Sequence, residues 1–231
     1  MKELIIFCEG QTEQRFCARL LQPHLFPTFD GIIHTFPVGG KNDHHIYGVV
    51  KYGPLQKFIR NTLLQRTRND IRFTTLIDLY AIPGDFPGKS TTRRDPSNPT
   101  PYVEALEQAF GADIDDYRFI PHIQLYEYET MLYSDPEAFR ISFENIDIEV
   151  SEIHQIVRSV PSIEHINDHK NTAPSRRIIQ LIPEYRGSKT TAGVDIADFL
   201  GLQLIRSKCP HFDRWLTKLE KLFPQESEAQ P

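Results

Sequence analysis

The sequence predicts an α/β fold with a mostly parallel sheet flanked by helices, followed by a helical C-terminal portion. Apolar strands alternate with amphipathic helices over the first 130 residues, which favours a parallel sheet. The first strand is apolar throughout, as in a sheet that is buried on both faces. We therefore expect an α/β core at 1–134, a helical portion at 135–223 packed on that core, and a frayed tail at 224–231.

The expected elements follow from apolar periodicity and from the positions of proline and glycine. After a strand at 4–8, Thr12 is expected to cap a helix that Pro23 and Pro27 end. The elements expected after it are a strand at 31–38, a loop at 39–48, a helix at 52–69, a strand at 73–82, an irregular segment at 83–101, a helix at 102–114 and a strand at 117–129.

Composition excludes several classes of protein. With 39% hydrophobic and 25% charged residues, the chain is typical of a globular protein, and no apolar run approaches the roughly 20 residues that span a bilayer. The net charge of −5 provides no global basic surface, so nucleic-acid binding would need a local basic patch or metal ions. Cys8, Cys17 and Cys209 are widely spaced, which favours reduced buried thiols in a cytoplasmic protein without a signal peptide.

Acidic residues stand at the carboxyl ends of three expected strands. Glu9 follows the first strand, Asp78 lies late in the most apolar strand, and Glu127 and Glu129 end the last strand. The carboxyl ends of parallel strands lie at one edge of a sheet, so we expect these acids to converge there. Strand alternation would point Glu127 and Glu129 to the same face, which supports a joint role but also fits a solvated strand face.

Converging carboxylates repel one another unless they are protonated, paired or bridged by a cation. Clusters of carboxylate oxygens suit hard divalent cations such as Mg²⁺ or Mn²⁺, which can promote phosphodiester hydrolysis. The ordinary alternative makes each acid a separate turn cap, surface residue or salt-bridge partner. That alternative is favoured for any single acid, whereas the metal site is favoured for Glu9 and Asp78 together, because each interrupts an apolar strand.

Five blocks carry a resemblance to a known family. In chain order they are "EGQTEQRF", "TTLIDLYAIPGDFPG", "RFIPHIQLYEYETMLYSDPEAF", "EHINDHKNTAPSRRI" and "IADFLGLQLIRSKCPHFDRWLTKLEKL". The chain resembles, over nearly its whole length, an uncharacterised TOPRIM-like family that is often encoded beside an ABC- or AAA-type ATPase. The resemblance implies a TOPRIM-like sheet and a metal-dependent nuclease that acts with an ATPase in phage defence or DNA processing. DNA is favoured over RNA as the substrate, and a homo-oligomer is compatible with the sequence.

The resemblance also assigns ligands by position. Glu9 is similar to the metal-binding glutamate of TOPRIM domains, and Asp78 to the first aspartate of their Asp-x-Asp motif. Tyr80 stands where the second aspartate would be. Asp85, or one of the two glutamates of the last strand, is expected to supply the missing ligand.

Basic residues and one further acid complete the expected site. OLD-type nucleases place a lysine near the metals, and Lys189 in the glycine-flanked "YRGSKTTAG" segment resembles it, with a solvated loop lysine as the alternative. Arg176 follows Ser175, an expected helix cap, and is a second candidate for phosphate binding. Glu13, one helical turn after Glu9, is expected to act as a second-shell ligand or general base.

The histidines and the basic 88–95 segment form no metal or nucleotide motif. His44 and His45 are expected in an exposed loop, His122 on the strand face opposite the paired glutamates, and His211 in packing contacts. "GKSTTRRD" lacks the spacing of a phosphate-binding P-loop and is a candidate basic lid.

Two other functions fit the same residues. The chain could be a non-catalytic binding or sensor subunit of an ATPase complex that uses a degenerate TOPRIM cleft, which the missing second aspartate and the acidic net charge favour. It could also be a toxin-like RNase.

Overall fold

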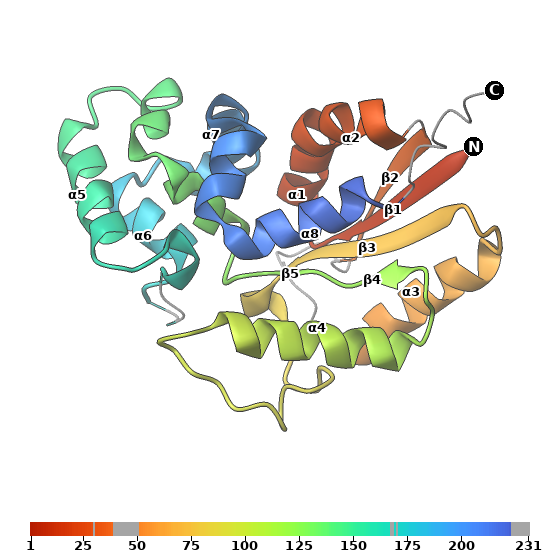
Figure 1. The fold of residues 1–231 in the computed structure, drawn as a ribbon. Helices are drawn as coiled ribbons and strands as arrows, with labels where there is room; N and C mark the ends of the chain where they lie inside the picture. The colour runs from red at the N-terminus through yellow and green to blue at the C-terminus, as the bar shows by residue number, and fades with distance from the viewer. Residues whose placement is uncertain (30, 39–50, 167–168, 170, 223–231) are drawn as a thin grey trace, which may run out of the picture.

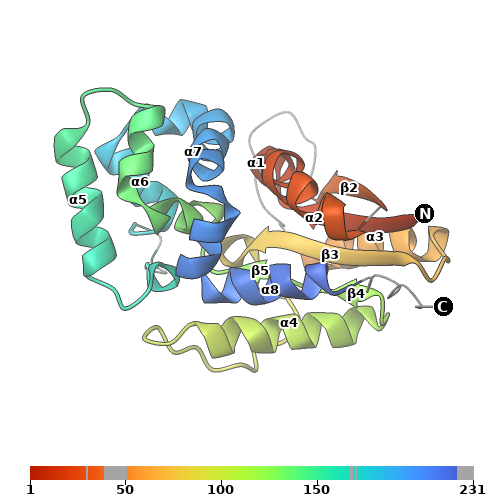
Figure 2. The same ribbon diagram turned by 45° about the horizontal axis from the view of Figure 1, so that its top comes forward.

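The computed structural model describes residues 1–29, 31–38, 51–166, 169 and 171–222. At its centre is a parallel sheet in the order β2-β1-β3-β4, with β5 also paired to β3 (Figures 1 and 2). The strands are β1 (Lys2–Cys8), β2 (Gly31–Pro37), β3 (Ile71–Asp78), β4 (Phe119–Ile120) and β5 (Ile123–Gln124). The predicted α/β fold with a mostly parallel sheet is confirmed.

Helices flank this sheet and make up most of the C-terminal portion. In the described ranges they are α1 (Gln11–Phe16), α2 (Gln22–Phe29), α3 (Tyr52–Gln65), α4 (Thr100–Ile114), α5 (Asp147–Arg158), α6 (Pro174–Leu181), α7 (Tyr185–Lys208) and α8 (Pro210–Glu220). A π-helical turn (Cys17–Leu21) joins α1 to α2, and 3₁₀ turns occur at Leu79–Ala81, Tyr128–Ser134, Pro136–Ile141 and Ile163–His165. None of these helices has the length and apolar character that crossing a bilayer requires.

The two faces of β1 contribute to two hydrophobic cores. Leu4, Ile6 and Cys8 pack into the core formed with α1, α2, α7 and α8. Ile5 and Phe7 point the opposite way, into the core formed with α3 and α4. Figure 1 shows these helices on opposite sides of the sheet. Burial on both faces explains why residues 4–8 of β1 form an uninterrupted apolar run rather than an alternating one.

One core is shared by the two parts of the chain that the sequence divides at residue 134. The ring of Phe16, in α1, lies edge-on to the rings of Tyr128 and Phe212, at centroid distances of 5.5 and 6.0 Å. Phe212 belongs to α8, so the helical portion packs directly against the first helix of the α/β core. Helices α5, α6 and α7 lie beyond the carboxyl ends of the strands (Figures 1 and 2), where they cover that edge of the sheet.

The first helical segment differs from its prediction at both ends. Gly10, rather than Thr12, precedes α1. The segment also continues through the π-helical turn into α2, which ends at Phe29. Pro23 and Pro27 both lie inside this continuous helical segment, so neither proline ends it.

The last predicted strand is much shorter than expected. β5 ends at Gln124, and Tyr126 then takes a left-handed backbone with φ of 62°. Glu127 is extended, and Tyr128 begins a 3₁₀ turn. The prediction that Glu127 and Glu129 alternate on a strand is therefore wrong, because the chain turns before either residue.

Other predictions concern side chains and chain ends. Cys8, Cys17 and Cys209 are free and buried, as the sequence predicts. The expected loop at 39–48, with His44 and His45, lies outside the described residues, as does the tail at 224–231. The expected helix at 52–69 ends at Gln65, before a turn at Asn69 and Asp70.

Candidate functional site

Glu9 and Asp78 are neighbours at the carboxyl edge of the sheet. Glu9 directly follows β1, Asp78 is the last residue of β3, and these strands pair in parallel. The backbone N–H of Asp78 donates a hydrogen bond to Glu9 Oε2 at 3.0 Å. In the described part of the chain, neither carboxylate forms an ion pair with an arginine. Within the described residues, the first two acids therefore meet without an arginine partner of their own.

Three more carboxylates surround this pair. Burial raises the pKa of Glu9 from 4.5 to about 8, and the charges of Glu13, Glu129 and Glu127 contribute to this shift. Glu13 accepts a hydrogen bond from the backbone N–H of Gly10 at 2.8 Å, which fixes it at the start of α1. We refer to these five residues (Glu9, Glu13, Asp78, Glu127 and Glu129) as the acidic cluster.

The acidic cluster favours bound protons when no cation is present. Burial raises the pKa of Asp78 well above its ordinary value, and the neighbouring acids, Glu9 and Glu13 first, add to this shift. Burial also raises the pKa of Glu13 to about 7, against the opposing hydrogen bond from Gly10 and the charge of Lys189. Among the described residues, the buried Asp78 Oδ1 has no hydrogen-bond partner. Such an arrangement is costly for ionised carboxylates unless a cation joins them.

Lys189 brings a positive charge to one side of the cluster. Its Nζ lies 3.1 Å from Glu129 Oε1, and the hydroxyl of Tyr185 donates to the same oxygen at 3.3 Å. Burial lowers the pKa of Lys189, but the charge of Glu129 and its hydrogen bond, with the charges of Glu127 and Asp78, together outweigh burial and raise the pKa overall. Lys189 lies in α7, so the prediction that it belongs to a loop is wrong. The buried side chains of Tyr185 and Ala192 hold this part of the helix in place, and the helix continues through Gly187.

Glu127 connects the cluster to α6. Its carboxylate accepts hydrogen bonds from the backbone N–H of Ser175 at 2.7 Å and from the Ser175 hydroxyl at 3.1 Å. Ala173 is the residue that precedes α6, so the prediction that Ser175 caps this helix is wrong. Instead, Glu127 accepts the free backbone N–H of Ser175 in the first turn of the helix. Arg176 is exposed in the first turn of α6, and no contact joins it to the acidic cluster in the described chain.

Asp85, one of the expected sources of the missing ligand, is bound to a helix terminus, and Tyr80 occupies the second aspartate position of the motif. Asp85 accepts hydrogen bonds from the backbone N–H of Tyr52 at 3.2 and 3.4 Å, so it caps the start of α3. Tyr80 lies in the turn after β3 and donates its backbone N–H to the carbonyl of Tyr126 at 3.1 Å. Asp85 therefore caps a helix, and Glu127 and Glu129 are the expected alternatives that lie in the acidic cluster.

The oxygens of the acidic cluster are spread apart. Within the described residues, the single group of three potential ligands whose atoms all lie within 4.8 Å of one another is Glu107, His122 and His211, at another place in the fold. Repulsion between ionised carboxylates favours such spreading in the absence of a cation. The all-oxygen donor set fits a hard divalent cation, and so does Asp78 Oδ1, which has no hydrogen-bond partner in the described part of the chain, provided that the carboxylates rotate toward the ion.

A family model described as "Domain of unknown function (DUF4276)" matches residues 8–220. The chain belongs to this family. The match spans every member of the acidic cluster together with Lys189 and Arg176, and it stops before the tail. No curated protein and no solved structure matches the chain.

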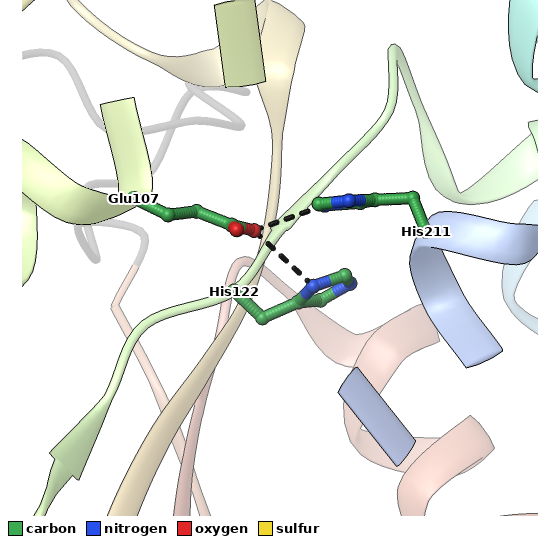
Figure 3. A group of neighbouring side chains, drawn as sticks. All are labelled: Glu107, His122 and His211. Atoms are coloured by element: carbon green, nitrogen blue, oxygen red, sulfur yellow. Dashed lines mark hydrogen bonds and ion pairs between the residues drawn. The ribbon is translucent and has the colours of Figure 1, made fainter. Parts of the chain in front are cut away.

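The DUF4276 chain also contains a second polar group that its sequence does not reveal. Glu107 (α4), His122 (between β4 and β5) and His211 (α8) point toward one another (Figure 3). We call these three residues the Glu–His–His group. Glu107 Oε1 lies 3.0 Å from His211 Nε2 and 3.4 Å from His122 Nδ1. The group includes His211, for which the sequence predicts packing contacts alone.

Electrostatics inside the Glu–His–His group differ from those of the acidic cluster. Burial opposes ionisation of Glu107, but its interactions with His122 and His211 lower its pKa to about 2. Burial lowers the pKa of His122 to about 4. Burial also lowers the pKa of His211, but hydrogen bonding to Glu107 raises it overall. The sequence does contain one sign of this group. Glu107 lies four residues after the buried Val103, so it is an acid on the apolar face of α4.

Proposed function

We propose that this DUF4276 protein is a metal-dependent TOPRIM-like nuclease that hydrolyses phosphodiester bonds in DNA. The observation that carries the proposal is the convergence of Glu9 and Asp78 at the carboxyl ends of paired strands, where the buried Asp78 Oδ1 has no hydrogen-bond partner among the described residues. Three further carboxylates and one lysine adjoin this pair. Carboxylate oxygens of this kind bind Mg²⁺ or Mn²⁺, and the bound ion polarises phosphate and activates water.

Some acids of the cluster would bind the cation, and one would transfer a proton. Glu9, Asp78 and Glu129 would hold the cation, and Glu127 would join them or orient α6 through Ser175. Glu13, whose pKa is raised to about 7, is suited to accept a proton from the attacking water, because a general base works best near the operating pH.

The cationic side chains would bind the scissile phosphate. Lys189 Nζ is 3.1 Å from Glu129 in the present structure. Ligation of Glu129 to a cation would weaken this ion pair and leave the ammonium to stabilise charge on a non-bridging phosphate oxygen. Arg176 is exposed at the start of α6, from which it could contact the backbone of a nucleic acid.

The biological setting is part of the same proposal. The biological setting is supported by the resemblance of the chain to a family that is often encoded beside an ABC- or AAA-type ATPase. We infer a cytoplasmic protein that works with such an ATPase in phage defence or DNA processing.

Metal binding and cleavage test the proposal together. Calorimetry with Mn²⁺ and Mg²⁺ should detect saturable binding by the wild type, lost in Glu9→Ala/Asp78→Ala. Glu152→Gln, which removes an exposed acid from α5, is the matched control and should bind as the wild type does. Cleavage of plasmid, linear and single-stranded DNA should require the same two acids. A wild type that binds neither cation contradicts the nuclease proposal.

A non-catalytic binding or sensor subunit of an ATPase complex is the second candidate. Tyr80 at the second aspartate position and the wide spacing of the acidic oxygens favour it. This candidate predicts that the purified chain binds an ATPase partner without hydrolysing DNA or RNA under any metal condition. Parallel assays on RNA substrates separate both candidates from the RNase alternative.

A further inference from the structure

A pocket of about 500 Å³ lies between α4 and α8, beside the segment that joins β4 to β5. All three members of the Glu–His–His group contribute to its lining, together with Arg214 and Trp215. The group shares no residue with the acidic cluster. It therefore offers a second place for chemistry, with a different set of ligand atoms.

The separations in the group match those of a tetrahedral metal site. A zinc ion with bonds of about 2.0–2.1 Å places neighbouring ligand atoms about 3.3 Å apart. Glu107 Oε1 lies 3.0 Å from His211 Nε2 and 3.4 Å from His122 Nδ1, and the three ligand atoms lie within 4.8 Å of one another. Small side-chain shifts would therefore suffice for binding.

His122 is not well satisfied by protein groups. Its ring is fully buried and stacks on Trp215, with centroids 4.4 Å apart and an interplanar angle of 10°. Among the described residues, Nε2 has no hydrogen-bond partner, and the 3.4 Å from Nδ1 to Glu107 exceeds the usual hydrogen-bond length of about 2.7–3.2 Å. A buried polar group of this kind needs an explanation, and an ion is one of the few available.

We propose that Glu107, His122 and His211 bind Zn²⁺, with the fourth coordination position open toward the pocket. Two imidazole nitrogens and one carboxylate oxygen favour zinc over magnesium. Three protein ligands leave one position for water or a substrate atom, and the pocket gives access to it.

Neighbouring groups would orient these ligands. Ile123 donates its backbone N–H to Glu107 Oε1 at 2.8 Å, which fixes the carboxylate. Gln124 is close enough to influence the pKa of His122, and its Oε1 is a buried acceptor that has no hydrogen bond among the described residues. With zinc on Nδ1, the Nε2–H of His122 would donate to this oxygen. Such outer hydrogen bonds are typical of metal-bound histidines.

Arg214 provides one opposing contact, which the metal must displace. Its guanidinium lies 3.4 Å from His211 Nδ1, whereas zinc on Nε2 requires a proton on Nδ1. Arg214 also holds Glu104 at 2.7 Å and is half exposed. It can therefore keep that ion pair while it moves away from the imidazole.

Zinc titration of the full chain tests the proposal. After chelation and removal of the chelator, the wild type should bind one equivalent of Zn²⁺ that Glu107→Gln binds at least tenfold more weakly. His154→Gln is the matched control, since it removes a partly exposed histidine that pairs with Glu137 at 2.9 Å, and it should bind as the wild type does. No zinc binding by the wild type, or equal affinity in Glu107→Gln, overturns the proposal and leaves a hydrogen-bonded packing group.

A spectroscopic measurement on the wild type removes any dependence on variant folding. X-ray absorption of the one-equivalent zinc complex should show nitrogen and oxygen ligands with the scattering of two imidazoles. A shell made of oxygen alone overturns the assignment, because it would place zinc in the acidic cluster. Glu9→Gln/Asp78→Asn should retain the zinc equivalent, so this proposal and the magnesium-dependent nuclease proposal can fail independently.

Discussion

The carboxylate of Glu9 accepts a hydrogen bond from the backbone N–H of Asp78, so the ends of two neighbouring strands are joined by one of the acids that they present. The bond lowers the pKa of Glu9, yet burial and the neighbouring carboxylates raise it overall to about 8. The two acids are thus held together at an energetic cost that a cation would relieve.

Replacement of Glu9 by glutamine should separate stability from function. The amide oxygen can still accept the Asp78 N–H bond, but it carries no charge. At pH 8 without metal, we expect the free energy of unfolding to rise by about 1–3 kcal/mol. Affinity for Mn²⁺ should fall at least tenfold. Urea unfolding and calorimetry measure these effects, and a less stable variant with unchanged metal affinity would contradict the assigned role.

Stability of the metal-free protein should fall as pH rises. Glu9 and Glu13 have pKa values raised from 4.5 to about 8 and about 7, so the folded state binds more protons than the unfolded state between about pH 4.5 and 8. Their stabilising contribution is complete below pH 4.5 and is lost as pH rises through the folded-state values. Mn²⁺ should restore most of the loss at pH 8. Urea unfolding at pH 5.5 and 8 checks this; Glu9→Gln/Asp78→Asn should show a flatter dependence, and an unchanged slope would refute the prediction.

Lys189→Met should affect stability and cleavage in different ways. Loss of the ammonium leaves buried Glu129 with the Tyr185 hydroxyl as its remaining polar contact among the described residues. We expect a destabilisation of about 1 kcal/mol at pH 8, because the pair is partly exposed. Nuclease activity should fall at least a hundredfold, since the charge would stabilise the transition state. Arg186→Met, an exposed change on the same helix, should leave both quantities unchanged; equal losses in the two variants would exclude a specific role.

Two glycines of α7 should respond oppositely to alanine. A Cβ at Gly193 would lie 2.9 Å from the hydroxyl of Tyr185, which donates to Glu129, and 3.5 Å from the ring of Tyr128. We expect Gly193→Ala to destabilise the protein by about 1–3 kcal/mol. A Cβ at Gly187 would meet no atom within 4 Å, so Gly187→Ala should stabilise by about 0.5–1 kcal/mol. Thermal unfolding distinguishes the two variants. If Gly193→Ala also stabilised the protein, the Tyr185 hydroxyl would be free to move away from the added Cβ, which would contradict its fixed contact with Glu129.

The convergence of Glu9 and Asp78 could be predicted because it depends on strand order and direction alone. Each acid ends an apolar strand, and parallel strands bring their carboxyl ends to one edge. Glu127 and Glu129 reach the same place by a different route. A left-handed turn at Tyr126 and a 3₁₀ segment position them, and a tyrosine gives no sequence signal for positive φ.

The Glu–His–His group could not be predicted from spacing. Its members come from α4, from the link between two short strands and from α8, and His211 lies 104 residues after Glu107. Each residue alone has an ordinary interpretation, as a helix carboxylate or as an aromatic packing group. Their relationship depends on how α8 docks across the sheet, and that docking is fixed by tertiary contacts such as the 2.8 Å hydrogen bond from Trp215 Nε1 to Thr74 Oγ1.

The contact of Phe16 with Tyr128 and Phe212 has a consequence for how this chain can be dissected. A fragment ending at residue 134 would expose the apolar surface that α7 and α8 now cover, and it would also lack Lys189. We expect the polypeptide to unfold in a single cooperative transition, with Trp215 fluorescence and far-ultraviolet circular dichroism changing at the same denaturant concentration. Truncation is therefore unsuited to dissecting this protein, and point substitution in the intact chain is the appropriate tool.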